Sequence, residues 1–265
     1  MVAADPSRVI EVLARREDLL STLEEQPMEK RRLVDTLAVS RSTVDRAVRR
    51  LESVGMVRRD SGVVRLTLAG RLALARYESY RESLAGLGNA WPFLGPVPPD
   101  ADLSLDLFGE ATTVPAERYA PHQPVQVLKT MLRGADRIRG VVTAVLPEYV
   151  DLYHRLIVEE ATTVELVVAT PVLSELVQNF ASELRACLET GRLQIREVTE
   201  SPPFSTVIAT DQEPEIAVVV YGDRGTTGLI RNDTEAAIEW GRSWIRDWES
   251  RADPIDLEMA TDSIQ

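Results

Sequence analysis

Residues 40–51, SRSTVDRAVRRL, constrain the fold of this chain more than any other stretch. Ser40 is a favourable N-cap, because its hydroxyl can accept a hydrogen bond from a free amide in the first helical turn. Apolar residues follow at the i, i+3, i+4, i+7 spacing that predicts one buried stripe on a helix: Val44, Ala47, Val48 and Leu51. At 100° per residue, the opposite face carries Ser42, Arg46, Arg49 and Ser53.

This polar face is flanked by Thr43, Asp45 and Arg50. Arginine forks and short hydroxyl groups pair well with base edges and phosphates in the major groove of DNA. Taken alone, the pattern fits an ordinary solvated helix face equally well. The neighbouring segments decide between the two interpretations.

Residues 28–37, MEKRRLVDTL, predict a second short helix opened by Pro27, and residues 38–40 make a tight turn into the helix above. Two short helices joined in this way are typical of a helix-turn-helix. Gly55 ends the second helix, and residues 57–59 and 63–67 then predict a hairpin, or wing, around a turn at residues 60–62. The sequence therefore predicts a winged helix-turn-helix that binds double-stranded DNA through Arg41, Ser42, Thr43, Arg46, Arg49 and Arg50 of the helix and Arg58, Arg59 and Arg65 of the wing.

The remaining elements predict two domains. Residues 5–25 form a first helix, and residues 68–87 form a long helix that either contacts a partner subunit, connects the domains or packs on its own domain. Its apolar side carries Leu72, Tyr77, Tyr80, Leu84 and Leu87. Residues 88–100 are rich in proline and glycine, which predicts a domain boundary. We therefore expect a winged-helix domain with its connector helix (1–88), a linker (89–100), a second domain (101–251) and an acidic tail (252–265).

The second domain alternates between strand and helix patterns. Helices are expected at 147–158, 171–190 and 233–251, and strands at 139–146, 164–169, 193–198, 205–210, 215–221 and 226–231. Continuous Val/Ile runs predict a sheet covered on both faces, and the closely spaced late strands make that sheet mixed, so the fold class is α/β. Trp240, Trp244 and Trp248 recur every four residues, which places an aromatic face against the sheet or a partner subunit.

Charge is divided unevenly along the chain. Residues 1–88 hold 16 basic and 13 acidic residues, a balance of +3, whereas residues 89–265 hold 14 and 29, a balance of −15. Only two of the 30 basic residues are lysines, Lys30 and Lys129. An acidic, arginine-rich composition resembles that of halophilic archaeal proteins, although a high-GC bacterial genome also favours arginine.

Several functional classes are not supported. No apolar run approaches the ~20 residues of a membrane span, and no secretory signal opens the chain, so we expect a cytoplasmic protein without a membrane partner. Cys187 is the single cysteine, which excludes an internal disulfide and predicts a buried small side chain. We expect no cofactor, metal or catalytic residues, because two histidines, His122 and His154, are few for a transition-metal site and no nucleophile, zinc or phosphate-loop motif occurs.

Both halves resemble known archaeal regulators. The runs LVDTLAVSRSTVDRAVRRLESVGMVRR and VVRLTLAG are similar to archaeal winged-helix domains. The second half resembles the methanogenesis-regulator (FilR) and TrmB-like families in PHQP (121–124), residues 139–147, VELVVATPVLSEL (164–176), PPFS (202–205) and residues 220–240. The resemblance implies a haloarchaeal transcription regulator that binds promoters as a homodimer, with a sensor domain distantly like the phospholipase D scaffold. Neither histidine has the lysine two residues on that phospholipase D chemistry requires.

Candidate effector-binding residues lie at the predicted strand ends and in one proline-flanked loop: His122, Arg224, Arg231 and Asn232. Each also has a local explanation, with residues 223–225 as a hairpin turn and residues 232–233 as a helix N-cap. The sequence thus favours a DNA-binding regulator that senses a small metabolite, such as a sugar or an intermediate of central-carbon metabolism. The alternative is a regulator whose second domain only dimerises or recruits a protein. A third possibility, an enzyme with an accessory winged helix, is disfavoured because the sequence shows no paired catalytic groups.

Overall fold

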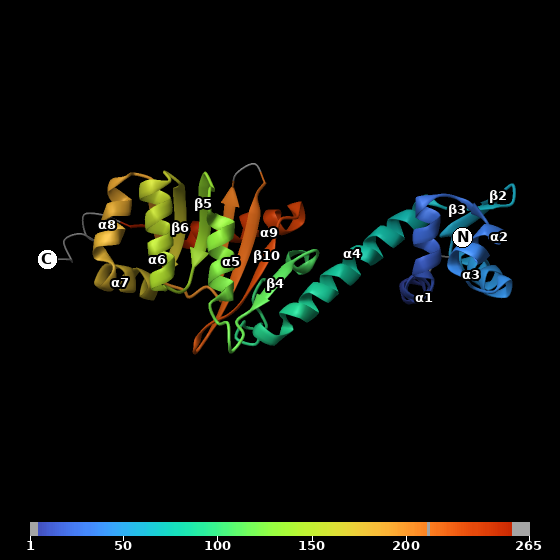
Figure 1. Cartoon of the computed structure of the whole chain (residues 1–265), viewed down its shortest axis with the longest axis horizontal. Helices are drawn as coiled ribbons and strands as arrows, with labels where there is room; N and C mark the ends of the chain where they lie inside the picture. Colours follow the sequence, from blue (N-terminus) through green and yellow to red (C-terminus); the bar gives the residue numbers. More distant parts are fainter. Residues whose placement is uncertain (1–4, 211–212, 256–265) are drawn as a thin grey trace. The chain divides into compact units, whose positions relative to one another are not determined.

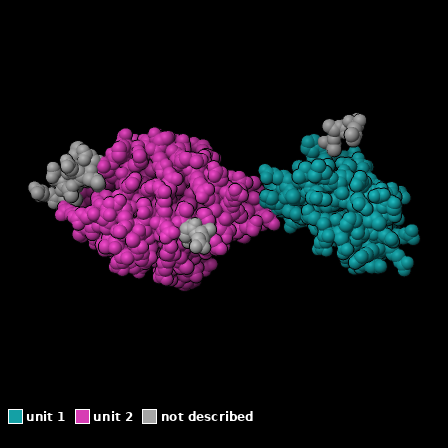
Figure 2. Space-filling model, turned by 90° about the horizontal axis from the view of Figure 1, so that it is seen from above, with its two compact units in different colours: residues 1–81 teal, residues 82–265 magenta. Residues whose placement is uncertain are grey.

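The computed structural model describes residues 5–210 and 213–255 and divides the chain into two compact units, residues 1–81 and 82–265 (Figures 1 and 2). The division falls within helix α4 (Leu68–Ala90), which continues from one unit into the other. Each unit has its own hydrophobic core.

The first unit is the expected winged helix-turn-helix. It contains α1 (Pro6–Glu25), β1 (Met28–Glu29), α2 (Lys30–Leu37), α3 (Arg41–Ser53), β2 (Val57–Asp60), β3 (Val63–Leu66) and the first part of α4. The predicted helix at 28–37 begins only at Lys30, because Met28 and Glu29 pair with Val64 and Val63 of β3 instead. This pairing makes β1 the third strand of a sheet with the order β1-β3-β2.

Helix packing and turn geometry explain this unit. The predicted apolar stripe of α3 is buried, and it packs with Leu20, Leu33 and Val64 in one core. Ser61 and Gly62, with φ of 50° and 87°, make the two-residue hairpin turn of the wing. Positive φ at both central residues favours the strand twist of a hairpin, and glycine adopts it without strain.

The predicted linker at 89–100 is not a linker. Helix α4 runs on to Ala90, and a 3₁₀ turn, η1 (Trp91–Phe93), follows with Pro92 in its first turn, where no amide hydrogen bond is lost. Ala90 and Phe93 are buried in the core of the second unit. The Phe93 ring lies so close to Gly228 that a Cβ atom there would approach it to 2.3 Å. Apolar side chains in this Pro/Gly-rich segment thus belong to the second unit, and the boundary lies at residues 81/82 instead of 88.

The second unit is a mixed eight-stranded sheet in the order β11-β7-β6-β5-β8-β9-β10-β4. Strands β5, β6 and β7 are parallel to one another, and the other pairs are antiparallel. The strands are β4 (Thr112–Pro115), β5 (Arg137–Val142), β6 (Thr163–Ala169), β7 (Leu193–Val198), β8 (Ser205–Thr210), β9 (Glu215–Gly222), β10 (Gly225–Asn232) and β11 (Asp253–Pro254). The expected mixed α/β class is confirmed.

Helices cover both faces of this sheet (Figure 1). Along β9, Ile216, Val218 and Val220 belong to one core cluster, and Ala217 and Val219 belong to the other. One cluster lies under α9 (Glu235–Arg251) with η2 (Leu105–Phe108). The other lies under α5 (Gln123–Leu132), α6 (Pro147–His154), the π-helical turn η3 (Arg155–Glu159) and α8 (Ala181–Glu189), with α7 (Thr170–Asn179) beside them.

Several predictions for this unit are confirmed. Trp244 and Trp248 of α9 are buried against the sheet, and the Phe204 ring stacks on Trp244 at 4.8 Å. Cys187 is buried, as expected for a small apolar side chain.

Other predictions for this unit were wrong. The expected helix at 171–190 breaks at Phe180, whose backbone is not helical, so it forms α7 and α8. Thr234, not the 232–233 pair, caps α9. The expected acidic tail starts with a strand, because Asp253 and Pro254 pair with β7; residues 256–265 of that tail lie outside the described residues. Strand β4 and helix α5 were not predicted.

Candidate nucleic-acid interface

Helix α3 is held rigidly at its start and along one side. The Ser40 hydroxyl accepts a hydrogen bond from the Thr43 amide at 3.2 Å, which satisfies one free donor of the first turn. The buried stripe fixes the rotation of the helix about its axis, because all four of its side chains are nearly inaccessible. The polar face must then point away from the core.

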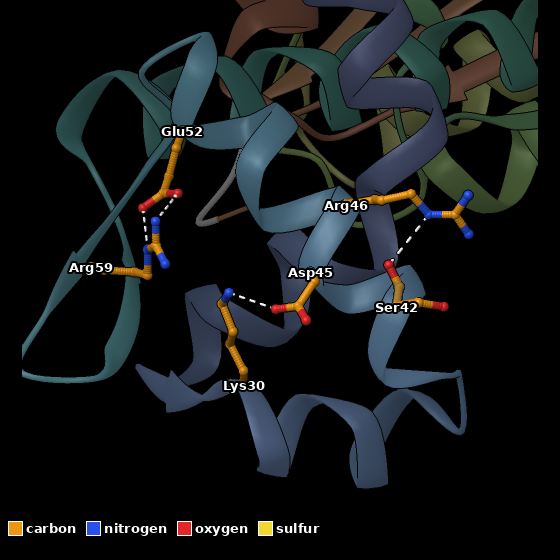
Figure 3. Close-up of polar contacts among 6 residues, drawn as sticks. All are labelled: Lys30, Ser42, Asp45, Arg46, Glu52 and Arg59. Carbon is orange, nitrogen blue, oxygen red and sulfur yellow. Dashed lines mark hydrogen bonds and ion pairs between the residues drawn. The ribbon is translucent and has the colours of Figure 1, made fainter.

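That outward face is basic. The exposed residues include Arg41, Ser42, Arg46, Arg49 and Arg50, and Thr43 is half-buried. Arg46 extends away from α3, and its Nε donates to the Ser42 carbonyl oxygen at 3.3 Å (Figure 3). Across residues 5–210 and 213–255, no ion pair engages these four arginines, so their charges remain available to an anionic partner.

The one acid on α3 near this face is neutralised internally. Lys30 at the start of α2 donates to Asp45 at 2.6 Å (Figure 3). The hydrogen bond from Lys30 holds the pKa of Asp45 below its usual range. The pair therefore fastens α2 to α3 and reduces the repulsion that a free carboxylate would exert on phosphates.

Strand alternation places the three arginines of the wing on two different faces of the hairpin. Arg58 and Arg65 are direct cross-strand partners and share the outer face, whereas Arg59 lies opposite Val64 on the inner face. On that face Arg59 makes two hydrogen bonds to Glu52 of α3, at 2.6 and 2.8 Å (Figure 3). Glu52 raises the pKa of Arg59. Arg59 therefore links the wing to α3, and its guanidinium is engaged by Glu52.

Arg58 is exposed on the wing, and no ion pair among the described residues engages it. Arg65 is half-buried, and its outer nitrogen lies 3.7 Å from Asp60. Residues 28–67 hold ten basic and five acidic residues, a balance of +5, and three of those acids, Asp45, Glu52 and Asp60, pair with basic residues of the same unit. The sequence reasoning missed Arg31 and Arg32, which are exposed on α2. Their signal was present, since the first helix of a helix-turn-helix crosses the DNA backbone.

The four candidate effector residues do not form one site. Asn232 is buried and fully bonded: its Nδ2 donates to the carbonyl oxygens of Leu107 and Gly109 at 3.0 and 2.6 Å, and its Oδ1 accepts from the Thr234 amide at 2.7 Å. Arg231 is paired with Glu215 of the neighbouring strand, Nε to Oε2 at 2.8 Å. Both residues therefore have structural roles.

The other two lie elsewhere. His122 is exposed immediately before α5, and Arg224 is exposed in the turn between β9 and β10. Arg224 and Arg231 flank opposite ends of β10, roughly 23 Å apart at 3.3 Å per residue. The described residues contain no cluster of three metal-ligating side chains, and none of the described helices is long and apolar enough to cross a membrane.

Two protein families match successive parts of the chain. Residues 7–86 match the HVO_A0261 N-terminal domain, and residues 121–251 match the family described as methanogenesis regulatory protein FilR1, middle domain. This chain is a FilR-like transcriptional regulator. The regulatory role described for the FilR1 family is compatible with the basic surface of α3.

Solved structures show more distant similarity. TrmBL2, described as an archaeal chromatin protein with a novel mode of DNA binding, is 12% identical, covers 95% of this chain and all of its own, and gives a TM-score of 0.40. The phospholipase D family member Nuc from Salmonella typhimurium is 8% identical over 55% of this chain and 97% of its own, with a TM-score of 0.42. NucT from Helicobacter pylori is 7% identical over 55% and 98%, with a TM-score of 0.40. No curated protein sequence matches the chain.

Proposed function

We propose that this FilR-like regulator recognises specific promoter sequences as a homodimer and that residues 82–265 sense a small molecule. The observation that carries the DNA-binding part is the exposed arginine face of α3, opposite a fully buried stripe. Arg46 and Arg49 are assigned to base edges, with Ser42 and Thr43 beside them near the start of the helix. Phosphate contacts are assigned to Arg41, Arg50, Arg58 and Arg65, with Arg31 and Arg32 of α2.

Exposed apolar residues on α4 support the homodimer. Leu68, Leu72 and Tyr80 are 71%, 63% and 51% exposed, and Leu72 and Tyr80 belong to the predicted apolar side of this helix. Large apolar side chains grouped on one exposed helix are typical of protein interfaces. Leu72→Glu should therefore lower the mass measured by sedimentation from dimer to monomer, whereas Thr36→Glu, at an exposed residue of α2, should retain the dimer. A wild-type monomer at micromolar concentration would refute this part.

The DNA-binding proposal is tested by fluorescence anisotropy with genomic fragments, at low and at molar salt. Wild type is compared with Arg46→Ala and with Arg15→Ala, an exposed arginine on α1. If Arg46 reads bases, its loss should weaken specific binding by about 1–3 kcal/mol and relax sequence preference, while Arg15→Ala changes nothing. Equal binding by wild type and Arg46→Ala would show that α3 is not the recognition helix.

The alternative to sensing is that the second unit binds no small molecule. Residues 82–265 would then only dimerise or recruit a protein, and no small molecule would change their melting temperature. A ligand that binds the native state must raise that temperature, so a thermal-shift screen in high salt separates the two. A cavity lined mainly by apolar side chains in the second unit favours sensing.

A further inference from the structure

The side of α3 opposite its buried stripe carries four exposed side chains along its centre: Ser42, Arg46, Arg49 and Ser53. The other two arginines of the helix, Arg41 and Arg50, are rotated toward its two flanks. The central side chains of a helix in the major groove lie nearest to the base edges, and those on its flanks lie nearest to the phosphates. Discrimination between bases therefore depends on the four central side chains.

Short hydroxyl groups at the start of α3 contribute little to that discrimination. The Ser40 oxygen lies 2.9 Å from the Ser42 oxygen and 2.8 Å from the Thr43 oxygen, so these hydroxyl groups are hydrogen-bonded to one another. A serine hydroxyl can also either donate or accept, and it therefore pairs with any base. The choice of base is left to the longer side chains.

The composition of α3 excludes readers of adenine and of cytosine. Its thirteen residues include no asparagine or glutamine, the side chains that recognise adenine through two hydrogen bonds. A carboxylate can accept from the amino group of cytosine, but both carboxylates of this helix have partners. Lys30 donates to Asp45 at 2.6 Å. Arg59 donates to Glu52 at 2.6 and 2.8 Å.

The two central arginines have free donors that suit guanine, which presents the acceptors O6 and N7 side by side in the major groove. The Nε of Arg46 donates to the Ser42 carbonyl oxygen at 3.3 Å, and the terminal nitrogens Nη1 and Nη2 point away from the helix (Figure 3). These two nitrogens are therefore available as a pair of donors. Arg49 makes neither a hydrogen bond nor an ion pair with any residue that the structure describes, so its guanidinium is available as well.

We propose that Arg46 and Arg49 each bind a guanine, so that the DNA contacted by one α3 contains two G·C pairs within three successive base pairs. The inference rests on the proposed DNA binding through α3 and names the class of sequence that this helix selects. An i, i+3 spacing separates the two arginines by about 4.5 Å along the helix and about 60° around it. Base pairs are stacked about 3.4 Å apart, so the two guanines belong to neighbouring pairs or to pairs with one other between them.

The test begins with a library of DNA duplexes that have a random central segment, from which the full-length protein selects sequences in successive rounds of binding. Wild type should enrich sequences with two G·C pairs within three base pairs. Glutamine binds adenine through two hydrogen bonds, so Arg46→Gln and Arg49→Gln should each change the preference at one of the two positions from guanine to adenine. Arg50→Gln, at a flanking arginine of the same helix, is the matched control. It should weaken the binding of all sequences alike and leave the preference unchanged.

Two base analogues test the same contacts with the wild-type protein, so this measurement does not depend on the folding of a variant. 7-Deazaguanine lacks the N7 acceptor, and at either selected position it should lower the affinity at least about tenfold, because a hydrogen bond from a charged donor is lost. Hypoxanthine keeps N7 and O6 and lacks only the amino group in the minor groove, so it should be bound like guanine.

The inference is overturned if the selected sequences lack the two G·C pairs, if either glutamine variant keeps the wild-type preference, or if 7-deazaguanine is bound as tightly as guanine at either position. In each of these outcomes the wild type still selects a sequence, so the proposed DNA binding is retained. A wild type that binds all duplexes alike, or binds none, would instead refute the proposed promoter recognition and the guanine contacts with it.

Discussion

Replacement of Tyr149 by phenylalanine should stabilise the second unit. Most buried tyrosines lose a hydrogen bond when the hydroxyl is removed, and the protein is then less stable by about 1 kcal/mol. At Tyr149 the hydroxyl is buried without a well-formed partner, while its ring packs in the core cluster that lies under α5, α6 and α8. Tyr149→Phe keeps the ring and removes only the unsatisfied group, so the sign of the effect should be reversed.

The magnitude follows from the cost of an unsatisfied buried polar group, which is about 1–3 kcal/mol. We expect a gain near the lower end, about 1 kcal/mol, because the neighbouring Tyr221 and Thr226 hydroxyls compensate the loss of water in part. For a unit of this size, 1 kcal/mol corresponds to a rise in melting temperature of about 2–4 °C.

Tryptophan fluorescence measures this effect in the correct unit. All four tryptophans, at positions 91, 240, 244 and 248, lie in residues 82–265, so urea and thermal unfolding followed by their emission report on that unit alone. Tyr119→Phe is the matched control, since Tyr119 is 88% exposed and its change should stay within about 0.5 kcal/mol. A loss of 1 kcal/mol or more in Tyr149→Phe would refute the reasoning, because it would mean that the hydroxyl is bonded within the protein.

Three further predictions concern both units. Leu51→Ala removes a fully buried side chain of α3 and should destabilise the first unit by about 2–5 kcal/mol, measured by circular dichroism; a loss below 1 kcal/mol would contradict the packing described. Glu52→Gln should release Arg59 for one more phosphate contact and steepen the salt dependence of log K for DNA by about 0.9 per log unit of salt, whereas an unchanged slope would show that Arg59 stays engaged. Burial raises the pKa of Cys187 from 9.0 to about 11 and raises the pKa of Tyr153 above its usual range, so the folded unit keeps protons that the unfolded chain releases. The free energy of unfolding should therefore decline as pH rises above about 9. A urea midpoint that stays constant up to about pH 11 would contradict this prediction.

Local sequence patterns determined much of the first unit. The stripe and cap of α3 and the turn of the wing are properties of residues within one or two helical turns of each other, and the structure shows them as expected. The strands at 193–198 and 205–210 have the predicted limits for the same reason. Strand alternation can be read from the sequence and places Arg58 and Arg59 on opposite faces of the wing. Only the structure shows that Arg59 then meets Glu52.

Other features depend on residues far apart in the chain. Ala90 and Phe93 lie in a Pro/Gly-rich stretch that looks like a linker, and they are buried because strand β10 offers a glycine, Gly228, against which a ring can pack. Residues 253–254 pair with β7 and add a strand at the edge of the sheet, which no local sequence pattern predicts. Packing also decided where the chain leaves space, since the cavity beside Tyr149 is bounded by side chains from five strands and four α-helices. The sequence therefore determined which side of α3 is buried and which side carries the arginines, because periodicity is local. The tertiary structure decided where the second unit leaves a cavity, because a cavity exists only after distant segments have packed.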